Sequence, residues 1–180
     1  MSTIIFITGG ERSGKSSFAQ KMAKKLSANP VYLATARIWD QDFAQRIERH
    51  KNERDEQWIT IEEDKKLSRH KLAENDVVLD CVTLWLTNIF ADNNFDFEKS
   101  LVEAQDEWTR FIDQNFTLIV VSNEIGMSLH AQTESGRKFV ELQGRINQYI
   151  AGMANEAYLM VSGISVKIKP LATLPEREGC

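Results

Sequence analysis

Cysteine, proline and histidine are scarce in this chain of 180 residues, which contains two, three and three of them. The two cysteines, Cys81 in an apolar run and Cys180 at the end, form no disulfide framework, so a reducing compartment is the simplest setting. We expect Cys81 to be a small buried hydrophobe. The histidines are far apart in sequence, and no group of Cys and His has the spacing of a metal site. The composition therefore predicts neither a disulfide-held scaffold nor a zinc site.

A strong charge bias and long apolar runs are also missing. The net charge of −4 gives no reason to expect nucleic acid as a partner. No apolar run approaches the length of about 18 residues that a membrane span needs, and no signal-peptide pattern opens the sequence. We therefore expect a cytoplasmic protein. Hydrophobic residues make up 42%, and no linker marks a boundary, so one domain over residues 1–180 is expected, with a frayed tail at 170–180.

Short apolar runs alternate with segments of helical periodicity. The expected strands are Thr3–Thr8, Val31–Ala34, Trp58–Ile61, Val77–Asp80, Leu118–Ser122 and Ala157–Val161. The expected helices are Lys15–Leu26, Gln41–Glu53, Thr83–Phe90, Phe97–Gln114 and Ser135–Asn155. Several strands are continuous apolar runs, which is typical of strands buried on both faces of a parallel sheet. The pattern predicts an α/β fold with a mostly parallel central sheet and helices on both faces.

A glycine-rich loop follows the first expected strand. Residues 9–16 read Gly-Gly-Glu-Arg-Ser-Gly-Lys-Ser, the G-x-x-x-x-G-K-S pattern of phosphate-binding loops, between a strand and a helix. Such a loop turns its N–H groups around a polyanion, and the helix directs its positive end at the same place. Lys15 would reach the β- and γ-phosphates, and the Ser16 hydroxyl would reach Mg²⁺. A purely structural turn would not need the full pattern, so we expect nucleoside triphosphate binding and a P-loop NTPase-like fold.

Two further strand ends are candidates for the same site, because ligands of open α/β sheets lie at the carboxyl ends of strands. The run Val77–Asp80 ends in a carboxylate, which either caps the next helix or helps to hold Mg²⁺ through water. Paired with the phosphate loop, the Mg²⁺ role is favoured for Asp80. The small residues Ala34, Thr35 and Ala36 would let a base or ribose approach the backbone, although an ordinary tight turn has the same pattern.

Four basic residues surround His50 in the segment Arg-Ile-Glu-Arg-His-Lys-Asn-Glu-Arg of residues 46–54. On a helix, Arg46 and Arg54 lie on the face of His50. Most such runs are solvated, charged helix faces. The alternative is a histidine held among phosphate ligands, where nearby cations favour the neutral, nucleophilic imidazole.

A set of motifs in this order resembles the bifunctional adenosylcobinamide kinase/adenosylcobinamide-phosphate guanylyltransferase family of cobalamin biosynthesis. The motifs, which span almost the whole chain, are Thr8–Ser16, Tyr32–Ala36, Arg46–Lys51 with Trp58, Leu79–Thr83 with Leu86–Asn88, Ser122–Gly126 and Gly144–Gln148. The resemblance implies phosphorylation of adenosylcobinamide by a nucleoside triphosphate. It further implies transfer of GMP from GTP to the phosphorylated product through a guanylylated histidine. It also implies a homotrimer. Whether ATP or GTP is the phosphoryl donor stays open.

Site residues follow from the resemblance position by position. The guanylylated histidine matches His50, and Lys15 serves both reactions. The residues that match the family's nucleotide-contacting positions are Gly9, Gly10, Glu11, Arg12, Ser13, Gly14, Lys15, Ser16, Ala34, Thr35, Ala36, Lys51, Asn52, Glu53, Arg54, Glu62 and Asp80. This chain departs from the family at Met127–Ala131 and Gly136–Glu141, where a Val-Pro pair and an Arg-x-Phe-Arg-Asp stretch are common, so its corrinoid preference could differ.

Two rival functions share part of these motifs. A monofunctional small-molecule kinase of the P-loop class would use the loop and Asp80 but would give His50 no task. A non-catalytic GTP-binding regulatory module would bind GTP through Lys15 without turnover. Labelling of the protein by the α-phosphate of GTP separates both rivals from the bifunctional enzyme.

Overall fold

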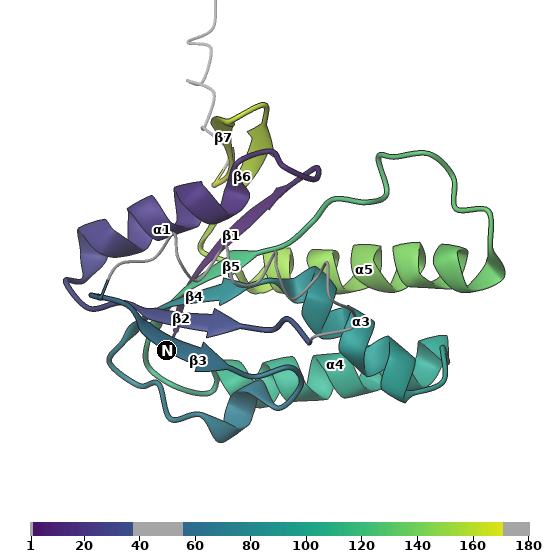
Figure 1. The fold of residues 1–180 in the computed structure, drawn as a ribbon, viewed down its shortest axis with the longest axis horizontal. Coiled ribbons are helices and arrows are strands. Elements are labelled where there is room, and N and C mark those ends of the chain that lie inside the picture. The colour runs from purple at the N-terminus through teal and green to yellow at the C-terminus, as the bar shows by residue number, and fades with distance from the viewer. Residues whose placement is uncertain (1, 38–55, 171–180) are drawn as a thin grey trace, which may run out of the picture.

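The computed structural model describes residues 2–37 and 56–170, which form one seven-stranded sheet with helices on both faces (Figure 1). The strands are β1 Thr3–Gly9, β2 Val31–Ala34, β3 Ile59–Glu62, β4 Asp76–Asp80, β5 Thr117–Val121, β6 Glu156–Val161 and β7 Ile164–Lys169. Their order is β3-β2-β4-β5-β1-β6-β7. All neighbours are parallel except β7, which is antiparallel to β6.

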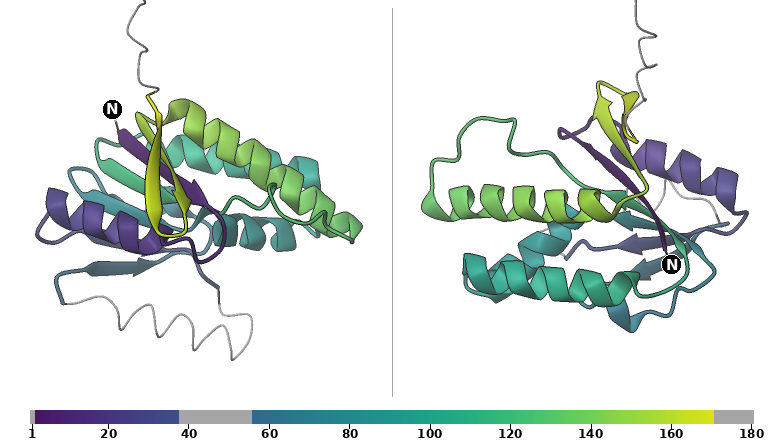
Figure 2. Two further views of the ribbon diagram at one scale, coloured as in Figure 1. Left: turned by 90° about the horizontal axis from the view of Figure 1, so that it is seen from above. Right: turned by 180° about the vertical axis from the view of Figure 1, so that it is seen from behind.

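Within the described ranges, four α-helices cover the sheet, α1 on one face and the other three on the opposite face (Figures 1 and 2). They are α1 Lys15–Leu26, α3 Val82–Asp92, α4 Phe97–Ile112 and α5 Glu134–Met153, and a short 3-10 helix spans Leu67–Arg69. Successive side chains of β1 are buried on alternate faces of the sheet. Ile5 and Ile7 pack in the cluster with α1, whereas Ile4 and Phe6 pack in the larger cluster with α3, α4 and α5.

Side-chain caps fix where two of the helices begin. The Asp96 carboxylate accepts the Lys99 N–H at 3.0 Å before α4, and the Thr133 hydroxyl accepts the Gly136 N–H at 3.1 Å before α5. Each cap satisfies an N–H group that lacks a partner within the helix. Both helices then bury one face, with Trp108 and Phe111 of α4 and Ile146 of α5 inaccessible to solvent.

These elements confirm the predicted fold class and the six expected strands, each within a residue or two. The expected helix Gln41–Glu53 lies outside the described residues, as does the tail beyond residue 170. Strand β7 is an additional element that we did not expect. It is an edge strand reached through a tight turn at Ser162 and Gly163, both with positive φ. Because β7 is exposed along almost its whole length, it lacks the buried apolar run that marked the other strands.

Candidate active site

The carboxyl ends of β1, β5, β4, β2 and β3 lie along one edge of the sheet, which we call the carboxyl edge. The register shows how they line up: Val121 of β5 is opposite both Ile7 and Asp80, and Ala34 is opposite both Asp80 and Glu62. The phosphate loop, Asp80, Ala34–Ala36 and Glu62 therefore lie along this edge. The strand pattern predicted this place for the first three, whereas Glu62 was named only through the family resemblance.

The phosphate loop takes its shape from a glycine at each end. At Gly9, φ is 153°, and a Cβ there would lie 2.4 Å from the carbonyl oxygen of Met160 in β6. Gly14 has φ 93° and forms the N-cap of α1, where its carbonyl accepts the Phe18 N–H at 3.0 Å. Any larger residue at either position would be strained. The loop thus leads directly into the positive end of a twelve-residue helix.

Lys15 folds back over its own loop. Its Nζ donates to the Gly10 carbonyl at 2.6 Å and to the Ser13 hydroxyl at 3.4 Å, and the residue is only 6% exposed. Burial lowers the pKa of Lys15, while the nearby carboxylates of Asp80 and Glu11 act to raise it. A desolvated ammonium group at the positive end of α1 is suited to an anionic ligand.

Asp80 is held by a tyrosine rather than used as a helix cap. The Tyr32 hydroxyl donates to Asp80 Oδ2 at 2.6 Å, and the N-cap of α3 is the next residue, Cys81. The capping alternative for Asp80 is therefore wrong. A carboxylate and the Ser16 hydroxyl are oxygen donors of the kind Mg²⁺ prefers. The described residues contain no cluster of three acidic, His or Cys side chains that could hold a metal. Two protein oxygen donors would fit an ion that also takes phosphate oxygens and water, as Mg²⁺ does in P-loop proteins.

Thr35 links the ends of β2 and β4. Its hydroxyl donates to the Cys81 carbonyl at 2.7 Å and accepts the Cys81 N–H at 2.8 Å, and its own carbonyl accepts from Asn88 Nδ2 at 2.9 Å. The residue is completely buried. The Thr35 side chain therefore holds β2 and β4 together and is not available to a ligand. Ala34 and Ala36, which are partly exposed, are the members of this segment that a base or ribose could approach.

The loop after β5 joins the two halves of the site. The Glu124 N–H donates to the Gly9 carbonyl at 2.9 Å, and the Asn123 N–H donates to the Thr83 hydroxyl at 3.1 Å. Gly9 begins the phosphate loop and Thr83 lies just beyond Asp80. The sequence pointed to residues 122–126 only through the family resemblance, because the position of β5 between β1 and β4 cannot be seen in the sequence.

Several predicted site residues lie outside the described residues: His50, Lys51, Asn52, Glu53 and Arg54. The described chain stops next to the carboxyl edge, where Arg37 pairs with Asp64 at 2.7 Å and with Asp92 at 2.8 Å. It resumes at residue 56, and Trp58 packs edge-on against Tyr32 with ring centroids 5.8 Å apart. Roles for the histidine segment stay predictions.

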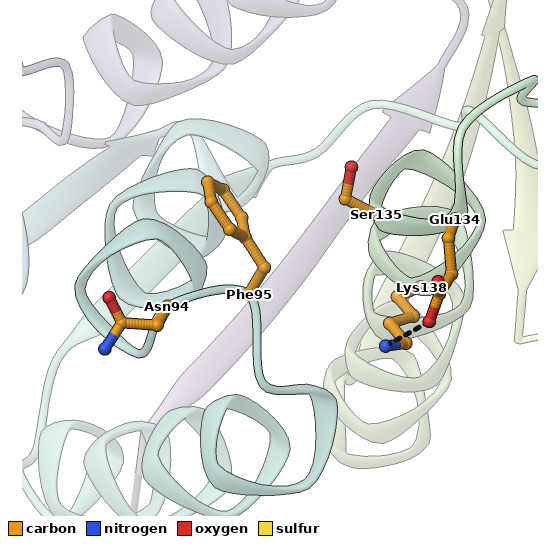
Figure 3. A pocket seen from close by; sticks show the side chains of 5 residues that line it. All are labelled: Asn94, Phe95, Glu134, Ser135 and Lys138. Atoms are coloured by element: carbon orange, nitrogen blue, oxygen red, sulfur yellow. Dashed lines mark ion pairs between the residues drawn. The ribbon is translucent and has the colours of Figure 1, made fainter.

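A hollow of about 350 Å³ lies elsewhere, between the turn after α3 and the start of α5 (Figure 3). Asn94 and Phe95 line one side, and Ser135, Glu134 and Lys138 line the other, where Glu134 and Lys138 form an ion pair at 2.7 Å. None of these residues belongs to the phosphate loop or to the strand ends beside it.

No described helix is long and apolar enough to cross a bilayer.

Known proteins resemble the chain over almost its whole length. It is 36% identical to the bifunctional adenosylcobalamin biosynthesis protein CobU of Escherichia coli K12, with 92% of this chain and 99% of that protein covered. The Salmonella typhimurium CobU is 31% identical with the same coverage. The Pseudomonas aeruginosa protein CobP is 32% identical, covering 91% of this chain and 95% of its own.

A solved structure supports the fold independently. An ATPase from a bacterial type III secretion system superposes with a TM-score of 0.55 at 9% identity, covering 92% of this chain and 56% of that one.

Residues 5–168 match the sequence profile of the family described as cobinamide kinase / cobinamide phosphate guanyltransferase. The chain, with its phosphate loop and Asp80 at one sheet edge, therefore belongs to the cobinamide kinase/cobinamide phosphate guanyltransferase family.

Proposed function

We propose that this protein phosphorylates adenosylcobinamide and then guanylylates the product, to give adenosylcobinamide-GDP in cobalamin biosynthesis. The observation that carries the proposal is the phosphate loop with buried Lys15 beside Asp80, in a chain that matches the family over residues 5–168. One domain, a cytoplasmic location and a homotrimer with sites near subunit boundaries belong to the same proposal.

The first reaction is phosphoryl transfer. The aminopropanol hydroxyl oxygen of adenosylcobinamide attacks the γ-phosphorus of ATP or GTP, the bond from that phosphorus to the bridging oxygen breaks, and the hydroxyl proton passes to solvent. The loop N–H groups and Lys15 hold the β- and γ-phosphates through this charge movement. Ser16 and Asp80 would hold Mg²⁺, which supplies charge neutralisation on the phosphates.

The second reaction is nucleotidyl transfer in two displacements. A ring nitrogen of His50 attacks the α-phosphorus of GTP, and pyrophosphate leaves. A phosphate oxygen of adenosylcobinamide phosphate then attacks the phosphorus bound to His50, which restores the imidazole. The phosphate loop that holds the γ-phosphate in the first reaction would stabilise pyrophosphate in the second. Lys51 and Arg54 would bind the guanylate, and Glu62 would accept hydrogen bonds from the ribose or base.

Labelling with GTP carrying ³²P at the α-phosphate tests the proposal. We expect acid-labile, alkali-stable label on the wild-type protein and none on His50→Ala. That variant should retain phosphoryl transfer at least in part. His130→Ala is the matched control, because His130 is exposed in the loop before α5, and it should label normally. An unlabelled wild type would favour a kinase alone, and equal labelling of His50→Ala would remove His50 from the mechanism.

Lys15→Ala tests whether the two reactions share a phosphate site. We expect this variant to lose most of both activities, because the same ammonium group binds the phosphates in each. Rates of phosphoryl transfer and of α-labelling, measured side by side, check this. A normal rate in either assay would contradict a shared site.

A further inference from the structure

Asn123 occupies the gap between the two groups expected to handle phosphate. Strand β5 lies between β1, which ends in the phosphate loop, and β4, which ends in Asp80. Its residue Val121 is in register with Ile7 on one side and Asp80 on the other. Asn123 comes two residues later, beyond the end of the strand. This position therefore lies between the phosphate loop and Asp80 along the carboxyl edge.

The backbone around Asn123 is fixed from three directions. The Asn123 N–H donates to Thr83 Oγ1 of α3 at 3.1 Å, and Asn147 Nδ2 of α5 donates to the Asn123 carbonyl at 3.2 Å. The next N–H, that of Glu124, donates to the Gly9 carbonyl at 2.9 Å. Three different elements thus set the direction in which residue 123 leaves the sheet.

A buried polar network next to Asn123 also fixes the backbone of this loop. Ser122 Oγ donates to Asn147 Oδ1 at 2.6 Å, and Gln143 Nε2 donates to both of these oxygens at 3.0 and 2.9 Å. All three residues are at most 7% exposed. In the described part of the chain, Gln143 Oε1 is buried without a partner, whereas the other polar side-chain atoms of this network are hydrogen-bonded. Burying those atoms without their hydrogen bonds would cost free energy, so the network favours one arrangement of the backbone. Gln143 and Asn147 are therefore positioning residues for Asn123.

The carboxamide of Asn123 itself has no assigned task in the fold. Among residues 2–37 and 56–170, both hydrogen bonds of Asn123 use main-chain atoms, and its side chain pairs with no other residue. The residue is partly exposed. The neighbouring Glu124 carboxylate is engaged within its own loop, where it accepts the Gly126 N–H at 2.8 Å. A rigid backbone thus presents a neutral donor with two N–H groups at the carboxyl edge.

We propose that Asn123 Nδ2 donates a hydrogen bond to an oxygen of the terminal phosphate of the bound nucleoside triphosphate. This inference rests on the proposed function only in that a triphosphate occupies the phosphate loop. A neutral carboxamide stabilises phosphate charge without giving up a proton. Because the contact forms only when the γ-phosphate is bound, Asn123 favours the triphosphate over the diphosphate. The contact makes Asn123 a catalytic residue for phosphoryl transfer, because the γ-phosphoryl group is the group that moves.

Binding of triphosphate and diphosphate, compared in one variant, tests the contact. The probes are guanosine 5′-(β,γ-imido)triphosphate and GDP, each titrated with Mg²⁺ into the full-length protein by calorimetry. Asn123→Ala should bind the triphosphate analogue about tenfold more weakly, because a hydrogen bond to a charged group is lost, and should bind GDP within about twofold of wild type. Asn123→Asp should bind the analogue more weakly still, since a carboxylate repels the phosphate.

Two further variants keep the test decisive. Asn123→Ser serves where Asn123→Ala folds poorly, and it should show the same selective loss. Asn29→Asp adds the same charge at an exposed position before β2, at the opposite edge of the sheet, and should leave both affinities unchanged. The inference would be overturned if the ratio of the two affinities in Asn123→Ala and Asn123→Asp equals that of the wild type, whether both affinities stay the same or fall by the same factor.

The outcomes also separate this inference from the proposed function. A wild-type protein that binds the analogue but does not phosphorylate adenosylcobinamide would refute the proposed kinase reaction while the binding comparison still decides the role of Asn123. A wild type that is active, beside an Asn123→Ala variant with wild-type kcat and an unchanged affinity ratio, would refute the contact alone.

Discussion

Burial decides the reactivity of the one described cysteine, Cys81, although it lies next to Asp80 in the candidate site. Burial, followed by the charge of Asp80, raises the pKa of the Cys81 thiol to about 12. The thiolate is the reactive form, so Cys81 should be inert at ordinary pH. We expect folded Cys180→Ser to give no reaction with Ellman's reagent at pH 8, and one equivalent in guanidinium chloride. Rapid reaction of the folded variant would show that Cys81 is accessible.

The charge of Asp92 should contribute to stability against acid. Hydrogen bonds from Arg37, and then from Lys65, hold the pKa of Asp92 at about 2, below its ordinary value of 3.8. A carboxylate with a depressed pKa in the folded state stabilises it above the ordinary pKa, and this contribution is lost as pH falls toward the folded value. The window of loss is therefore between about pH 4 and pH 2.

The variant Asp92→Asn measures this contribution. Because the Asp92 side chain is 35% exposed, solvent screening reduces the expected cost to about 1 kcal/mol at pH 6. The difference from wild type should shrink at pH 4 and approach zero near pH 2, as followed by urea unfolding across the series. Asp106→Asn, at an exposed position of α4, is the control and should cost little at any pH. A difference that does not change with pH would contradict the ionic origin.

At the scale of elements, the first turn of α3 is tied to the end of β5 by a single side chain. Thr83 Oγ1 accepts the Asn123 N–H at 3.1 Å. Thr83→Val removes this acceptor and should cost about 1–2 kcal/mol, because the N–H is left without a partner. It should also reduce the preference for triphosphate over GDP. Thr83→Ser keeps the hydroxyl and should restore both properties. Urea unfolding and calorimetry check this, and wild-type stability of Thr83→Val would show that the bond is dispensable.

The elements differ in how well the sequence predicted them, and burial is the reason. Val77–Leu79 and Leu118–Val121 are buried on both faces, so their apolar runs stand out in the sequence. The phosphate loop was predicted because its backbone shape requires particular residue types. Strand β7 has no buried face, and its turn at Ser162 and Gly163 is a short signal. Strand order depends on contacts between distant residues, so the place of Asn123 beside Gly9 could not be predicted.

At the scale of the whole molecule, the hairpin of β6 and β7 exposes an apolar row. Val161, Ile164, Val166 and Ile168 are 51%, 67%, 47% and 40% exposed. Val161 is opposite Ile164 in register, and Val166 lies two residues further on, so these three share one face. Exposed apolar rows of this kind mark surfaces that other proteins or subunits cover.

Assembly should bury this row. We expect sedimentation equilibrium to give about three times the chain mass of 20.6 kDa, as a homotrimer requires. Two charges at the centre of the row, in Ile164→Glu/Val166→Glu, should yield the 20.6 kDa monomer because a buried, unpaired charge is costly. A wild-type monomer would contradict the trimer. Unchanged assembly of the double variant would contradict the hairpin as the interface.

The phosphate loop packs against β6 and the turn after it, far along the chain, and this has a consequence for synthesis. Strand β1 is flanked by β5 and β6, Gly9 fits closely under the Met160 carbonyl, and the Gly163 N–H donates to the Ser13 carbonyl at 3.0 Å. On the ribosome, the loop emerges well before the strands β5 and β6 that flank it. A nascent or truncated chain that stops before the hairpin carries the nucleotide-binding motif without a formed site. Binding of nucleotide is thus a property that the chain acquires only after the hairpin of β6 and β7 has been synthesised.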